Sequence, residues 1–155
     1  MTDPLVLFVC TGNTCRSAMA EALLRDALPP ESRWRTASAG VSTGNGYPAS
    51  LNAVQALAEV GVDLTRHRSR QLTRELVAGS ALIVAMTGGH RMHIESSHPG
   101  TCGKVALMRA FDPAAPLGSD VDDPHGYALE DYRECRDLIL RAIPGLRDHL
   151  LKGRP

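Results

Sequence analysis

Residues 5–17 of the chain read LVLFVCTGNTCRS, an apolar run that ends in a short polar loop bounded by a cysteine and an arginine. The run 5–10 is typical of a buried β-strand, and apolar residues then recur between Ala20 and Leu28 at the spacing of one helix face. A strand that leads directly into a helix brings backbone N–H groups and the helix dipole together, and proteins bind anions there. The sequence therefore predicts an anion-binding loop over residues 11–16.

Cys10 and Arg16 give this loop a reactive character. A helix N-terminus and a nearby guanidinium can lower a cysteine pKa to roughly 3.5–7.5, which produces a thiolate nucleophile. Arg16 can hold two oxygens of a bound phosphoryl group with paired hydrogen bonds. We expect a phosphate-handling thiol. The alternative is a buried structural cysteine beside a solvated arginine.

The remaining loop residues fit the same interpretation. Residues 11–16 are expected to curl so that their N–H groups point at a bound phosphoryl group, and Gly12 and Asn13 tolerate the positive φ that such a curl needs. Ser17 is predicted to cap the helix and to donate its hydroxyl to the Cys10 sulfur.

Length and composition restrict the class of protein. The 155 residues are 43% apolar and 22% charged, with zero formal net charge, which predicts one globular domain over residues 1–155. A neutral chain has no general basic field, so we expect no binding to nucleic acid or membranes. The first apolar run is too short for a signal peptide or a membrane span, and we expect a cytoplasmic protein.

The chain has four cysteines, at positions 10, 15, 102 and 135. They show neither zinc-ligand pairing nor the density of a disulfide scaffold, so no metal site is predicted. Cys15 lies close enough to Cys10 in sequence to form a reversible disulfide with it; alternatively, Cys15 only fills space in the loop. Cys102 and Cys135 are interpreted as packing residues.

Strands and helices alternate along the whole chain. The predicted strands are 5–10, 34–39, 81–86 and 104–107. The predicted helices follow residue 16, cover about 48–60 and 73–76, and begin after 88–89, and a last helix includes residues 132–143. The last helix has an apolar face, and Pro144-Gly145 is expected to kink or interrupt it. This order predicts an α/β three-layer sandwich around a four-stranded parallel sheet, with its ligand at the carboxyl ends of the strands.

A thiolate that attacks a phosphoryl group needs an acid to protonate the leaving atom. Residues 111–126 form a long loop rich in Asp, Pro and Gly, and loops of that length are usually functional. Asp123 is our candidate acid, because Pro124 stiffens the turn that follows it. An Asp-Pro pair that only makes a turn is the alternative.

These residues together resemble the low-molecular-weight protein tyrosine phosphatase family. The resemblance covers nearly the whole chain, at VCTGNTCRS (9–17), SAG (38–40), HRSRQLT (67–73), IVAM (83–86) and Asp123-Pro124. It implies Cys10 as nucleophile, Arg16 as phosphate clamp and Asp123 as general acid, with no cofactor, and substrate contacts from Thr11, Gly12, Asn13, Thr14, Cys15 and Arg16. It also implies that Asn13, Ser17 and His67 form a network supporting the loop. The expected partners are phosphorylated proteins, with the chain acting as a monomer or a weak dimer.

Two departures from the pattern of tyrosine-directed members bear on which phosphorylated residue is the substrate. The loop position that is typically isoleucine in tyrosine-directed members is Thr14, and residues 86–87 are Met-Thr where Met-Asp is frequent; both features resemble the protein arginine phosphatase branch. A guanidinium carries N–H donors, which a threonine hydroxyl can accept. The residue after the acidic turn is His125 rather than an aromatic, although Tyr47 or Tyr127 could reach the rim. We favour phosphoarginine, with phosphotyrosine as the alternative.

Two other functions fit the loop less well. A thioredoxin-coupled arsenate reductase needs two more cysteines close together, whereas Cys102 and Cys135 are 33 positions apart. A carrier that holds phosphate on a cysteine needs neither the arginine clamp nor a late acid.

Overall fold

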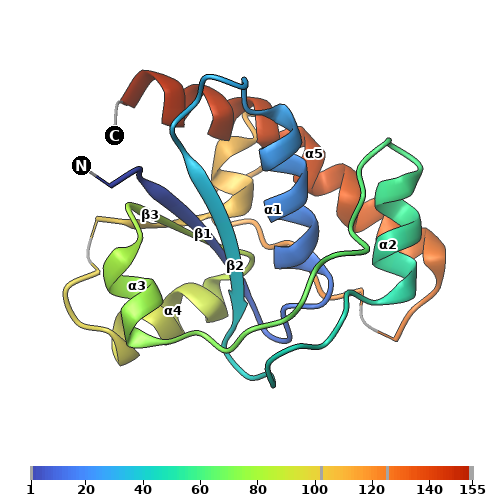
Figure 1. The fold of residues 1–155 in the computed structure, drawn as a ribbon, viewed down its shortest axis with the longest axis horizontal. Helices are drawn as coiled ribbons and strands as arrows, with labels where there is room; N and C mark the ends of the chain where they lie inside the picture. The colour runs from blue at the N-terminus through green and yellow to red at the C-terminus, as the bar shows by residue number, and fades with distance from the viewer. Residues whose placement is uncertain (1, 102, 125, 154–155) are drawn as a thin grey trace.

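The computed structural model describes residues 2–101, 103–124 and 126–153. Four strands form one sheet in the order β2-β1-β3-β4, and every neighbouring pair is parallel (Figure 1). The strands are β1 (Leu5–Cys10), β2 (Arg35–Gly40), β3 (Leu82–Ala85) and β4 (Val105–Leu107). The predicted four-stranded parallel sheet is confirmed, and β1 lies inside it with a strand on each side.

Helices cover both faces of the sheet, which makes the predicted three-layer sandwich (Figure 1). The helices are α1 (Arg16–Ala27), α2 (Leu51–Ala58), α3 (Arg74–Gly79), α4 (Gly88–Ser97), the 3-10 helix η1 (Met108–Phe111) and α5 (Leu129–Gly153). Val6 and Phe8 point into the core shared with α1, α2 and α5, whereas Leu7 and Val9 point into the core shared with α3 and α4. Because both faces of β1 are buried, its sequence is continuously apolar.

The C-terminal helix is not interrupted, which was one of the two effects predicted for Pro144-Gly145: α5 is a single helix across Pro144. A proline inside a helix costs about 3 kcal/mol. The buried face of α5, which includes Ile139 and Leu146 and packs in the core beneath α1, offsets that cost. Gly145 has a packing role, since a Cβ there would collide with the carbonyl of Phe111.

Two further predictions concern the rest of the chain. Cys135 is buried in α5, as expected for a packing residue, whereas Cys102 lies outside the described residues. Within the described part of the chain, no helix is long and apolar enough to cross a membrane.

Candidate active site

The loop over residues 11–15 connects the carboxyl end of β1 to the first residue of α1. Backbone hydrogen bonds from neighbouring segments hold it: Val41 donates to the carbonyl of Cys10, Ser42 to that of Thr11, and Ser50 to that of Thr14, at 2.9 to 3.0 Å. These donors follow β2 or precede α2, so segments distant in sequence fix the loop at the carboxyl edge of the sheet.

Cys10 precedes this loop and is buried, with 1% of the residue exposed. The backbone N–H of Asn13 donates to its sulfur at 3.3 Å, and the Ser17 hydroxyl lies 2.9 Å from that sulfur. The Asn13 side-chain amide donates to the Ser17 oxygen at 2.8 Å, so the Ser17 proton is available to the sulfur. Two hydrogen bonds donated to the sulfur stabilise the negative charge of a thiolate. The predicted capping role of Ser17 is wrong: it is the second residue of α1, and Cys15 occupies the cap position.

Asn13 is the centre of the loop. It is fully buried, and its φ of 57° makes it the single non-glycine residue with positive φ among those described. Its side-chain oxygen accepts the N–H of Arg70 at 2.9 Å, while its amide group donates to Ser17. Of the two residues expected to tolerate positive φ, Asn13 adopts it and Gly12 does not.

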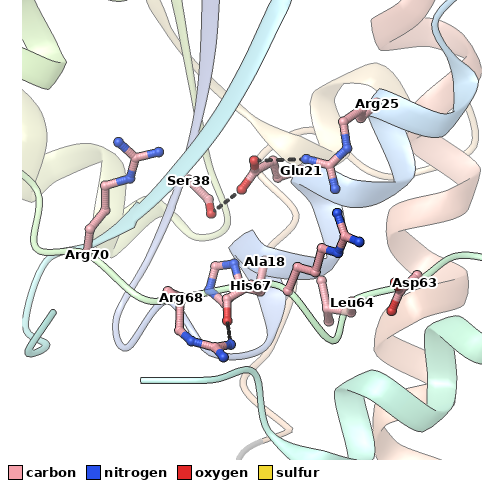
Figure 2. Close-up of a pocket in the computed structure, with 10 residues that line it drawn as sticks. Ala18, Glu21, Arg25, Ser38, Asp63, Leu64, His67, Arg68 and Arg70 are labelled. Atoms are coloured by element: carbon pink, nitrogen blue, oxygen red, sulfur yellow. Dashed lines mark hydrogen bonds and ion pairs between the residues drawn. The ribbon is translucent and has the colours of Figure 1, made fainter. Parts of the chain in front are cut away.

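His67 supports the loop from the side of the connector between α2 and α3. Its Nε2 lies 2.6 Å from the carbonyl oxygen of Asn13, which can only accept, so Nε2 carries the proton. Burial lowers the pKa of this ring below its usual value, which favours the neutral form. Figure 2 shows His67 at a cavity lined by residues of α1, β2 and the connector, among them Glu21, which accepts the Ser38 hydroxyl at 2.6 Å. Neither Cys10 nor Arg16 lines that cavity, so it lies apart from the anion-binding loop.

Arg16 is almost completely buried, with 4% of its side chain exposed. One terminal nitrogen donates to the carbonyl of Val121 at 3.0 Å, and the other lies 3.8 Å from the carboxylate of Asp123. Its Nε is buried and has no hydrogen-bond partner among the described residues, and the same is true of the Nε of Arg109. A buried guanidinium N–H without an acceptor is costly, and for Arg16, at the end of the loop after β1, a bound anion can supply the acceptor.

Asp123 comes to the same place from the late loop. Its two carboxylate oxygens lie 3.8 Å from Arg16 and 3.8 Å from the Cys15 sulfur, although 108 positions separate it from Cys15 in the sequence. About half of its side chain (48%) is exposed, so it can reach both solvent and the loop. The structure thus brings the predicted nucleophile loop, clamp and acid together.

Sequence reasoning missed His90, in the first turn of α4. Its Nε2 lies 2.9 Å from the Thr11 hydroxyl, and its Nδ1 lies 3.0 Å from the hydroxyl of Thr87. Burial, followed by the charge of Arg16, lowers its pKa to about 4. The sequence could have placed His90 in a first helical turn, because Thr87 caps α4 by accepting the N–H of His90. Nothing in the sequence indicated its contact with Thr11.

The structure also describes the other cysteines and tyrosines considered in the sequence, apart from Cys102. Burial raises the pKa values of Cys15 and Cys135 to about 12, and no disulfide links the described cysteines. Tyr47 and Tyr127 are largely exposed. His125, the residue after the acidic turn, lies outside the described residues.

Comparison with known proteins places this site in a family. The family described as low molecular weight phosphotyrosine protein phosphatase matches residues 5–154. The chain is 38% identical over 138 residues to a probable low molecular weight protein-tyrosine-phosphatase, EpsP, from Ralstonia nicotianae, covering 89% of the chain and 90% of the relative. It is 38% identical over 145 residues to a protein-arginine-phosphatase from Geobacillus stearothermophilus, covering 94% and 95%. A solved YwlE arginine phosphatase variant with a phosphorylated active-site serine superposes with a TM-score of 0.86 at 35% identity, covering 97% of each chain. The chain therefore belongs to the low-molecular-weight phosphotyrosine protein phosphatase family and is a cysteine-dependent phosphatase.

Proposed function

We propose that Cys10, Arg16 and Asp123 hydrolyse phosphorylated protein side chains through a cysteinyl-phosphate intermediate, and that phosphoarginine is preferred to phosphotyrosine. The observation that carries the chemistry is the pairing of a sulfur that receives two hydrogen bonds with a buried arginine whose Nε finds no acceptor in the described part of the chain. A phosphoryl group above the sulfur supplies the acceptor that Arg16 lacks.

In the first step the Cys10 thiolate attacks phosphorus, and the bond from phosphorus to the leaving nitrogen or oxygen breaks. Asp123 gives its proton to that leaving atom. Arg16 and the N–H groups of the loop stabilise the charge on the equatorial oxygens. Because Asp123 already lies beside Arg16, the acid reaches the site without a rearrangement of the sheet.

In the second step the ionised Asp123 takes a proton from a water molecule, which attacks the phosphorus of the cysteinyl phosphate. The bond between sulfur and phosphorus breaks, inorganic phosphate leaves, and the Cys10 thiolate returns to its hydrogen bonds with Asn13 and Ser17. Those two bonds stabilise the sulfur as a leaving group.

The substrate preference rests mainly on Thr14. Its carbonyl accepts the N–H of Ser50 at 2.9 Å, so the backbone that carries its side chain is held in place. A hydroxyl there can accept an N–H of a guanidinium, whereas a phenyl ring gains more from an apolar wall. Relatives named as tyrosine and as arginine phosphatases are equally similar to the chain, at 38% identity, so overall similarity does not decide between the substrates.

The test compares two peptides that differ only in carrying phosphoarginine or phosphotyrosine. We expect the unaltered enzyme to have the higher kcat/KM for phosphoarginine, and both Thr14→Val and Thr14→Ile to reduce that preference by about tenfold, the value of one hydrogen bond to a charged group. Thr14→Ser keeps the hydroxyl and is the matched control, which should retain the preference. If the unaltered enzyme prefers phosphotyrosine and Thr14→Ile leaves the ratio unchanged, the phosphoarginine assignment is wrong.

A further inference from the structure

His90 is a buried polar side chain that the mechanism above does not use. It is 7% exposed, and it joins two segments that are 79 positions apart: Thr11, directly after the nucleophile, and the first turn of α4. Its neighbours on other elements are charged, with Arg16 from α1 and Asp120 and Asp123 from the late loop, and His93 lies on α4 itself.

Both ring nitrogens of His90 have a hydroxyl partner. The Thr87 oxygen accepts the backbone N–H of His90 at 3.1 Å and lies 3.0 Å from Nδ1, and the Thr11 oxygen lies 2.9 Å from Nε2. In the neutral ring one nitrogen donates to its hydroxyl and the other accepts from its hydroxyl, so both hydrogen bonds form in either tautomer. The ring therefore links the residue that follows the nucleophile to the cap of α4.

The same end of α4 also holds the loop that carries the acid. The N–H of Gly88 donates to the Asp120 carboxylate at 2.8 Å. One residue later in that loop, the N–H of Val121 donates to the carbonyl of Met86 at 2.8 Å, directly before the cap of α4. Asp123 follows two residues after Val121. The start of α4 thus touches both the nucleophile loop and the acid loop.

We propose that His90 is a positioning residue: by hydrogen bonding to Thr11 from the helix end that anchors Asp120, it fixes the nucleophile loop relative to the loop that carries Asp123. The inference rests on the proposed roles of Cys10 and Asp123. Without the bond to Thr11 the two loops lose a common support, and the alignment of nucleophile and acid in the transition state suffers more than substrate binding. The expected signature is a lower kcat with little change in KM.

Two amide substitutions separate the two hydrogen bonds of the ring. In His90→Gln the amide nitrogen reaches toward the position of Nε2 and can donate to Thr11, whereas in His90→Asn the shorter amide reaches the position of Nδ1 and can bond only Thr87. We expect His90→Asn to lower kcat by about tenfold with KM changed less than about twofold, and His90→Gln to keep kcat within about threefold. The thermal midpoints report any loss of stability, and they should fall by similar amounts, because each variant keeps one of the two bonds. A purely structural role predicts equal kcat values for the two variants, and that result would overturn the proposal.

A double-mutant cycle tests the link to Thr11 directly. Thr11→Val removes the hydroxyl that bonds the ring, so combining it with His90→Asn should cost no more kcat than either change alone. Additive losses would show that His90 acts by another route, and the inference fails. If instead Cys10→Ser and Asp123→Asn leave phosphate release intact, the proposed function itself fails. If those two variants lose activity while His90→Asn does not, only the role of His90 is refuted.

Discussion

Replacement of Asn13 measures how much the loop after β1 depends on one side chain. Asn13 combines positive φ (57°) with two side-chain hydrogen bonds, to the Ser17 hydroxyl at 2.8 Å and from the Arg70 N–H at 2.9 Å. Asn13→Ala removes both bonds and places a Cβ without local hydrogen bonding in the left-handed region. Asn13→Gly removes the same bonds but adopts this φ freely.

The expected losses of stability follow from the two hydrogen bonds and from the left-handed backbone. Two hydrogen bonds are worth about 1 kcal/mol each, so Asn13→Gly should lower the free energy of unfolding by about 2 kcal/mol. Left-handed backbone adds about 1–2 kcal/mol for alanine, so Asn13→Ala should lose about 3–4 kcal/mol. Both variants should also lose kcat, because Ser17 no longer has the partner that directs its proton to the Cys10 sulfur.

Urea unfolding monitored by circular dichroism gives the free energies, and phosphate release from an aryl phosphate gives kcat. Asn13→Asp is the matched control, since it keeps the acceptor for Arg70 and loses the donor to Ser17. The reasoning is refuted if Asn13→Ala is as stable as Asn13→Gly, or if both lie within about 0.5 kcal/mol of the unaltered protein.

Two further predictions concern pH and close packing. The His90 pKa is about 4 in the fold and about 6.5 in an unfolded chain, so protonation between these pH values favours the unfolded state. The free energy of unfolding should therefore fall by up to about 3 kcal/mol as the pH drops from 6.5 to 4, and by less in His90→Gln. Urea midpoints measured across this pH range would show the difference. Gly40→Ala places a Cβ 2.5 Å from the Thr11 carbonyl, and Gly145→Ala places one against Phe111, so thermal unfolding should show both destabilised by about 1–3 kcal/mol. At temperatures where both remain folded, Gly40→Ala should lose kcat, because it displaces the loop, whereas Gly145→Ala should keep it; equal kcat values would contradict this.

Local pattern was sufficient to predict most of the fold. The unbroken apolar run of β1 follows from burial on both faces of a central parallel strand, and the polar loop after it follows from the strand-to-helix transition. The continuation of α5 through Pro144 could not be read locally, because packing of the helix face overrides the proline penalty. The packing that offsets the cost of Pro144 is visible only in the folded core.

The candidate site, like the fold, was predicted from the sequence only in part. The spacing of Cys10 and Arg16 fixes their places at the two ends of one loop, so sequence alone indicated that pair. The link from His90 to Thr11 spans 79 positions and depends on how α4 lies beside the loop, which no local pattern encodes. Which loop residue would take positive φ also depended on tertiary partners, because the Asn13 side chain gains hydrogen bonds that Gly12 cannot make.

The covalent role of Cys10 is tested most directly by trapping its phosphorylated form. Asp123→Asn lacks both the proposed acid of the first step and the proposed base of the second, so the substrate should be p-nitrophenyl phosphate, whose weakly basic leaving group departs without an acid. The intermediate should then accumulate when the variant is mixed with this substrate, denatured rapidly and mapped by mass spectrometry. We predict one phosphoryl group on Cys10, and none when Cys10→Ala is added to the same variant. Phosphate release without a phosphorylated Cys10, or the same phosphorylation in the Cys10→Ala control, would contradict the account.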